Sequence, residues 1–312
     1  MNSFIKISTF LMVCLITLSC SSDMNKEEVC LSENFKTSFK IRLDVDTHMT
    51  DYKDICPDND NEPETRSAEV WRLRYTVCAY SENGPSDVPV ASLSSLSPVI
   101  DLTLPLGKYN IIAWADYISD ESLNSHYFHT DDFTDILLRD KFSYSGDDSH
   151  KIGFIGNENL TVSYRTPELN IYMSPAMAQY KITALDSPDY NVSKVIVSYP
   201  EGLPSSLNAI SGKISHKWYG VSFETLPKDF VAKDNVFSEH EEIKVPVKIE
   251  VYDDRSVLRA RRNSIKIPLI KGGVTFVKAK IYSVLDPENG DMPQGGGITI
   301  DDEYDDVHII EI

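Results

Sequence analysis

The chain has 312 residues, of which 41% are hydrophobic and 10% aromatic, enough to form packed cores in two domains of ordinary size. Its 48 acidic and 30 basic side chains give a formal charge of −18, which argues against a nucleic-acid partner because phosphate binding requires clustered Lys and Arg. The sequence contains no complete nucleophile, metal or phosphate motif, so we expect neither a cofactor, nor a metal site, nor an enzymatic activity.

Residues 1–19 are predicted to be a signal peptide. Lys6 precedes the apolar run Ile7–Leu18, which is shorter than the ~20 residues that span a bilayer. The four residues that end in Cys20, Thr-Leu-Ser-Cys, have the pattern at which a signal peptidase cuts before a lipid-modified cysteine. Cys20 is therefore the predicted lipidation site, and the polar residues 20–32 are the predicted tether. The alternatives are an ordinary cleaved signal and an uncleaved short membrane anchor, each with an unmodified Cys20.

Three further cysteines remain after Cys20. Cys30 and Cys56 flank the first predicted strand and are a candidate disulfide, which leaves Cys78 unpaired. The loop-entropy argument gives such a bridge a stabilising contribution of about 3 kcal/mol. No spacing of Cys and His residues matches a zinc site.

Apolar and polar residues alternate with period two from residue 35 onward. This pattern predicts a half-buried first strand over Phe35–Val45. Prolines and acidic residues then indicate an exposed loop over Met49–Arg66, and a second strand follows with Trp71, Leu73, Tyr75, Val77 and Ala79 on one face. Val99–Leu104 and Lys108–Tyr117 are predicted to form a hairpin, and Asp131–Asp140 a short helix.

The second half of the chain shows the same period-two alternation of apolar and polar residues. After a break at Ser174–Met177, where we place a domain boundary, the pattern predicts strands at Tyr180–Ala184, Lys194–Tyr199, Gly212–Glu224, Ile243–Tyr252, Asn263–Leu269 and Val274–Leu285. Short strands separated by regular turn signals indicate an all-β fold of two β-sandwiches. The predicted domains are residues 33–173 and 174–312.

Several segments in order resemble the fimbrillin-like lipoproteins of Bacteroidales. They are the lipidation signal, the alternating first strand, the loop that ends in Thr65-Arg66-Ser67, and the sequences LGKYNIIAWAD (106–116), MSPAMAQYKI (173–182) and GGGITIDD (295–302). This resemblance implies two tandem transthyretin-like β-sandwich domains and a role in building, capping or anchoring type V fimbriae. It also implies other fimbrial subunits as partners and a location at the outer membrane, attached through Cys20 and exposed on the cell surface.

The resemblance further implies a route of assembly. In that family a protease cuts after an arginine in the loop after the first strand, the strand is lost, and a terminal strand of another subunit fills the groove. Arg66 and Ser67 match the cleavage position, and Phe35–Val45 matches the strand that leaves. The candidate donor strand is the C-terminal segment Val307, His308, Ile309, Ile310, Glu311 and Ile312. Anchor-type members keep both the first strand and the lipid. A last strand paired within its own domain is the alternative for residues 307–312.

A surface lipoprotein that binds a host or bacterial glycan is the second hypothesis. Trp71, Trp114, Trp218 and Tyr219 are the candidate stacking platforms. This hypothesis requires the rings to be exposed together on one face.

Overall fold

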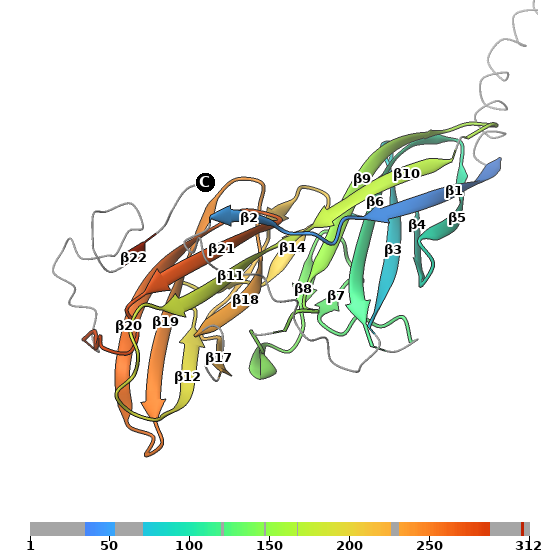
Figure 1. Ribbon diagram of the computed structural model, residues 1–312. Helices are drawn as coiled ribbons and strands as arrows, with labels where there is room; N and C mark the ends of the chain where they lie inside the picture. Colours follow the sequence, from blue (N-terminus) through green and yellow to red (C-terminus); the bar gives the residue numbers. More distant parts are fainter. Residues whose placement is uncertain are drawn as a thin grey trace, which may run out of the picture.

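The computed structural model describes residues 35–53, 71–119, 122–146, 148–166, 168–225, 231–287 and 307–308, and these are almost entirely β-structure (Figure 1). The predicted all-β class is confirmed. Among the described residues, no helix is long and apolar enough to span a bilayer. The predicted signal peptide and tether lie outside these ranges.

The first half forms one seven-stranded sheet that curves around its own core (Figure 1). Its strands pair antiparallel, except that β1 and β10 are parallel. In spatial order they are β4 (Ala91–Ser95), β3 (Arg72–Ser81), β6 (Gly107–Ile118), β9 (Gly153–Val162), β10 (Leu169–Pro175), β1 (Lys36–Val45) and β5 (Val99–Pro105).

Two predictions for this half are wrong. The strands β5 and β6 do not form a hairpin, because β5 pairs with β1 at one edge whereas β6 lies between β3 and β9. The segment Asp131–Asp140, expected to be a helix, is a turn followed by β8 (Ile136–Leu138), and the 3-10 helix η1 (Lys141–Ser143) begins only after it. The Asp132 carboxylate accepts the backbone N–H of Thr134 at 2.7 Å, which favours a turn over a continuing helix.

The remaining strands form four smaller sheets. They are β18 (Ala232–Phe237), β11 (Met177–Ala184), β21 (Gly273–Ala279) and β2 (Thr50–Lys53), with β22 (Val307–His308) also on β21; β17 (Ser222–Thr225), β12 (Val192–Ser198), β19 (Ile243–Asp253) and β20 (Leu258–Leu269); β13 (Leu203–Pro204) with β16 (Lys217–Trp218); and β15 (Lys213–Ile214), β14 (Ser206–Asn208), β8 and β7 (Phe128–His129). The single strand predicted over Gly212–Glu224 is therefore wrong, since β15, β16 and β17 divide it.

Two of these sheets contain residues from both sides of position 174. In one, β8 pairs with β14, and in the other β2 runs parallel to β21. The beginning of the predicted loop Met49–Arg66 is therefore a strand, and its partner is distant in sequence. The division into domains at residue 174 stays a prediction.

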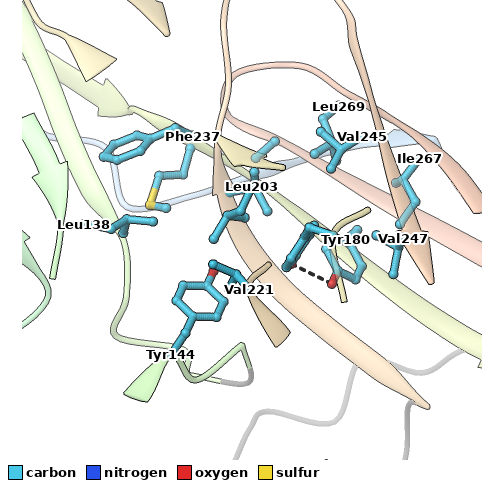
Figure 2. Packing of buried hydrophobic residues seen from close by; sticks show 14 of the residues in the cluster. Leu138, Tyr144, Tyr180, Leu203, Val221, Phe237, Val245, Val247, Ile267 and Leu269 are labelled. Carbon is cyan, nitrogen blue, oxygen red and sulfur yellow. Dashed lines mark hydrogen bonds between the residues drawn. The ribbon is translucent and has the colours of Figure 1, made fainter. Parts of the chain in front are cut away.

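Two hydrophobic cores result from this topology. One lies inside the seven-stranded sheet and includes Ile41, Val77 and Ile111. The larger one combines both halves, and Figure 2 shows Leu138 and Tyr144 from the first half beside Phe237, Leu203 and Val221 from the second. Because this second core covers the outer face of β3, both faces of β3 are buried, whereas its sequence predicted one buried face. The side chains that share the larger core with Tyr144 include Trp114, Phe128, Tyr180, Tyr199, Val245, Val247, Ile267 and Leu269.

Candidate strand-exchange site

The first strand occupies a slot in the seven-stranded sheet. One side of β1 pairs in parallel with β10, from Ile41 opposite Leu169 to Val45 opposite Met173. The other side pairs antiparallel with β5, from Lys36 opposite Pro105 to Arg42 opposite Val99. If β1 left, both β10 and β5 would therefore expose unpaired backbone N–H and C=O groups, which is the surface that captures an extended peptide.

The inward face of β1 provides the apolar part of the slot. Phe39, Ile41 and Leu43 are at most 6% exposed, and the residues between them face solvent. The predicted alternation is thus confirmed. Full burial of an apolar side chain of this size contributes about 1.5–3 kcal/mol, so an incoming strand must supply similar side chains at every second position.

Polar contacts at the surface accompany this register of β1. The Arg42 guanidinium lies 2.5 Å from the Glu168 carboxylate, and the Ser38 and Thr103 hydroxyls are 2.7 Å apart. These pairs are exposed, so they contribute little energy in water. The buried face of β1 sets the register, because a shift by one residue would turn the apolar side chains outward.

The outer edge of β21 is a second place where distant segments of the chain add strands. Thr50 of β2 pairs with Gly273 in the parallel direction, and Val307 of β22 pairs with Ala279 in the antiparallel direction. The segments occupy different parts of the same edge (Figure 1). A cut between β1 and β3 would thus free a segment that pairs with a strand in each half.

A buried ion pair links the two halves of the chain. The Lys151 Nζ donates to Asp234 Oδ1 at 2.6 Å, to the Tyr144 hydroxyl at 2.7 Å and to the Ser145 carbonyl at 2.7 Å. The Tyr144 and Tyr199 hydroxyls donate to Asp234 Oδ2. Burial raises the pKa of Asp234 and lowers the pKa of Lys151, although each charge favours the ionised form of the other. With its donors and acceptors paired, this network joins the loop before β9 to β18.

A family model described as a family of unknown function, DUF6562, matches residues 34–311. The chain belongs to this family. A comparison of the sequence with curated proteins finds no match.

Solved structures similar to this DUF6562 member include three from Bacteroidales. A candidate cell adhesion protein from Bacteroides eggerthii has a TM-score of 0.47 at 12% identity, over 88% of this chain and 94% of that one. A fimbrial assembly protein from Parabacteroides distasonis has a TM-score of 0.39 at 12% identity, over 79% and 92%. The tip fimbrial protein Mfa3 from Porphyromonas gingivalis has a TM-score of 0.39 at 11% identity, over 81% and 97%. Likeness at this level assigns no function.

Most of the site residues predicted from the sequence fall outside the described ranges. Those residues are Cys20, Cys30, Cys56, Arg66, Ser67, Ile309, Ile310, Glu311 and Ile312, so the predictions about them stay predictions. Of the candidate donor strand, Val307 and His308 are described, and they pair with β21 of the same chain. The thiol of Cys78 is free and buried. No group of three or more His, Cys, Asp or Glu in the described part is arranged to bind a metal.

The aromatic residues of the glycan hypothesis do not form a common exposed face. Trp114 is 0% exposed and lies against Phe128, with ring centroids 5.3 Å apart. Trp71 is half-buried and stacks on His150 at 4.3 Å. Trp218 is half-buried in the larger core, and Tyr219 is exposed. This arrangement argues against the glycan alternative.

Proposed function

We propose that this DUF6562 member is a fimbrillin-like subunit of a cell-surface fimbria, held in the outer membrane by a lipid on Cys20, that joins other subunits by β-strand complementation. One observation carries the proposal. The first strand of the fold is paired on both sides and packs three apolar side chains inward, yet it belongs to a segment that a single cut before β3 would release.

The chemistry of the slot supports a strand as its ligand. Recognition would come from main-chain hydrogen bonds on both sides, and specificity from the positions now filled by Phe39, Ile41 and Leu43. Because β10 runs parallel and β5 antiparallel to β1, a replacing strand in the orientation of β1 preserves both ladders.

Mass spectrometry of the mature protein from cell envelopes tests the proposed anchoring. For an accessory or anchor subunit, we expect an N-terminus at Cys20 with its lipid and no species that begins at Ser67. Species that begin at Ser67 would instead identify a processed shaft subunit. An unmodified Cys20 in the mature protein would refute lipid anchoring.

A tail variant tests the proposed complementation. Replacing Val307–Ile312 by six Gly and Ser residues preserves the chain length but removes the apolar side chains of the donor segment. We expect the variant to stay folded and to be absent from purified fimbriae, whereas the same replacement at residues 301–306 leaves incorporation unchanged. If the tail variant unfolds, the segment is an internal strand and is not a donor.

A further inference from the structure

The tip of the first half is the end of the seven-stranded sheet at which β1 begins, remote from the second half (Figure 1). Turns from distant parts of the sequence meet the start of β1 there. The Phe35 carbonyl accepts the backbone N–H of Leu106 at 3.2 Å, and the Thr37 hydroxyl donates to the Ser163 carbonyl at 3.1 Å. The turns between β5 and β6 and between β9 and β10 therefore lie beside the first residues of the described fold.

The turn at residues 82–90, between β3 and β4, completes the tip. The backbone N–H of Glu82 donates to the Lys108 carbonyl at 3.0 Å, which places this turn at the same end of the sheet. Two valines of the turn face solvent, since Val88 is 56% and Val90 52% exposed. The tip thus comprises residues 35–37, 82–90, 105–108 and 163–166.

Two exposed aromatic rings also belong to the tip. Phe35 is 45% and Tyr164 68% exposed, and their ring centroids lie 4.7 Å apart in an edge-to-face arrangement. In the described part of the chain eleven large apolar or aromatic side chains are exposed, and four of them are Phe35, Val88, Val90 and Tyr164. Single exposed apolar residues are common on any protein, whereas a group of them at one end marks a surface that contacts another phase or molecule.

The charge of the tip differs from that of the whole protein. Its exposed charged residues are Lys36, Lys108 and Arg165 against Glu82 and Asp87, so three positive and two negative charges leave a net charge of +1. The whole chain carries −18. The tip can therefore approach an anionic surface without the repulsion that the acidic remainder of the chain would meet.

We propose that the tip rests on the lipid surface of the outer membrane, with Phe35 and Tyr164 among the headgroups. This inference rests on the proposed lipid at Cys20. Aromatic rings are enriched at the boundary between headgroups and acyl chains, and Lys and Arg are attracted to lipid phosphates. Fourteen residues separate Cys20 from Phe35, and a flexible coil of that length spans about 20 Å. The tip is therefore the part of the described fold that the anchor holds nearest to the bilayer.

The anchor makes lipid the favoured occupant of the tip. Because the tether confines the tip beside the bilayer, contacts too weak to bind a free protein suffice to orient a tethered one. The orientation also directs the second half away from the membrane, because that half lies at the other end of the molecule (Figure 1). The β21 edge, with which Val307 pairs, would then face other subunits and not lipid.

Tryptophan quenching on vesicles tests this proposal. The mature chain with Cys20→Ser and an N-terminal histidine tag is bound to vesicles of phosphatidylcholine and phosphatidylglycerol that contain a nickel-chelating lipid, so that the tag replaces the anchor. When the lipids are brominated near the headgroup, Tyr164→Trp should lose at least ~2-fold more emission than Tyr219→Trp, which changes a residue 65% exposed in the second half. Equal losses for the two variants, or a loss for Tyr164→Trp no greater than that of the unmodified chain, would overturn the proposal.

Charges placed on the tip test whether its apolar residues enter the bilayer. In the Tyr164→Trp chain, the added substitutions Val88→Asp and Val90→Asp should reduce quenching at least ~2-fold, because carboxylates are costly to bury in lipid and are repelled by phosphatidylglycerol. The control Val257→Asp, at a residue 49% exposed in the turn between β19 and β20, should leave quenching unchanged. Far-UV circular dichroism identifies any variant that fails to fold. Undiminished quenching in the folded Val88→Asp, Val90→Asp chain would refute an apolar contact with lipid.

The same variants separate a lipid surface from a second copy of the chain. If a second copy covers the tip, the emission of Tyr164→Trp should shift with protein concentration in solution without vesicles, and brominated lipid should not quench it, which would refute the lipid contact. The histidine tag makes the vesicle result independent of Cys20. Absence of quenching, with a lipid found on Cys20 in cells, would refute the contact of the tip and leave the proposed anchoring intact, whereas an unmodified Cys20 would refute the anchoring itself.

Discussion

Replacing Lys151 by Met should strongly destabilise the junction between the two halves. The Lys151 side chain is 4% exposed and the Asp234 side chain 0%, so the substitution leaves a buried carboxylate without its cation. Removal of one partner of such a pair costs about 3–5 kcal/mol. The double variant Lys151→Met with Asp234→Asn removes both charges and should recover at least half of that loss. The surface variant Lys194→Met, whose partner Glu224 is 66% exposed, should cost less than about 1 kcal/mol.

The pH dependence of the Lys151→Met variant provides a second test. Burial raises the pKa of Asp234, and loss of the neighbouring cation raises it further. A carboxyl whose folded pKa exceeds its unfolded value of about 4 stabilises the fold below that unfolded value, and this contribution is lost as the pH rises through the folded pKa. The stability gap between the single and the double variant should therefore be smaller at pH 5 than at pH 8.

Urea unfolding followed by tryptophan fluorescence measures these differences, because Trp114 belongs to the same core as Tyr144 and Tyr199. A Lys151→Met loss no larger than that of Lys194→Met would contradict a cost from an unpaired buried carboxylate. A double variant as unstable as the single one would show that the cost comes from packing and not from an unpaired charge.

Three further predictions concern single positions. Gly153→Ala should cost about 1–3 kcal/mol in urea unfolding, because the new Cβ would lie 2.1 Å from Trp114 Cζ2, while Gly84→Ala, with its nearest neighbour at 3.5 Å, should cost less. Ile41→Ala should cost about 2–5 kcal/mol in the same assay, since Ile41 is 0% exposed in the β1 slot; a loss below about 1 kcal/mol would mean that the slot closes without it. Partial burial raises the pKa of Asp186, but hydrogen bonds from the Ser283 side chain and from the backbone N–H groups of Ile281, Ser283 and Tyr282 lower this pKa overall. The Asp186 carboxylate therefore stabilises the fold above its unfolded pKa of about 4, and this contribution is lost as the pH falls through the folded pKa. Asp186→Asn should therefore destabilise at pH 7 and lose its effect near pH 2, and a pH-independent loss would contradict this assignment.

The period-two pattern made β1 predictable because one face of this strand is solvent-exposed and the other is buried. Phe39, Ile41 and Leu43 are buried as their spacing indicates. The predicted pairing of β5 with β6 is wrong, because partner choice depends on which strands the whole fold brings together, and short loops only favour the pairing of adjacent strands. The predicted helix is wrong because Ile136 pairs with Leu207, a contact that tertiary structure imposes on an ambiguous apolar segment.

The ion pair between the halves had no local signal in the sequence. Lys151 and Asp234 are 83 residues apart, and each has other charged residues close to it in the sequence. Only the fold distinguishes them, by burying both within hydrogen-bond distance of tyrosine hydroxyls. The strand β2 was hidden for a similar reason, since its partner β21 is distant in sequence and proline-rich acidic chain follows directly after it.

The composition of the candidate donor strand bears on whether the chain keeps β1. In either register Val307–Ile312 supplies at most two apolar side chains at alternate positions, Val307 with Ile309 or Ile310 with Ile312, whereas β1 supplies three over ten residues. The loss of one buried side chain alone costs about 1.5–3 kcal/mol, before the shorter backbone ladder is considered. A copy of this tail is therefore a poor replacement for β1 in its own slot. The difference in buried side chains favours a chain that retains β1 over one in which a copy of this tail replaces it. Adding a synthetic Val307–Ile312 peptide to the intact chain should accordingly leave β1 protected from hydrogen exchange, and displacement of β1 by that peptide would reverse the assignment.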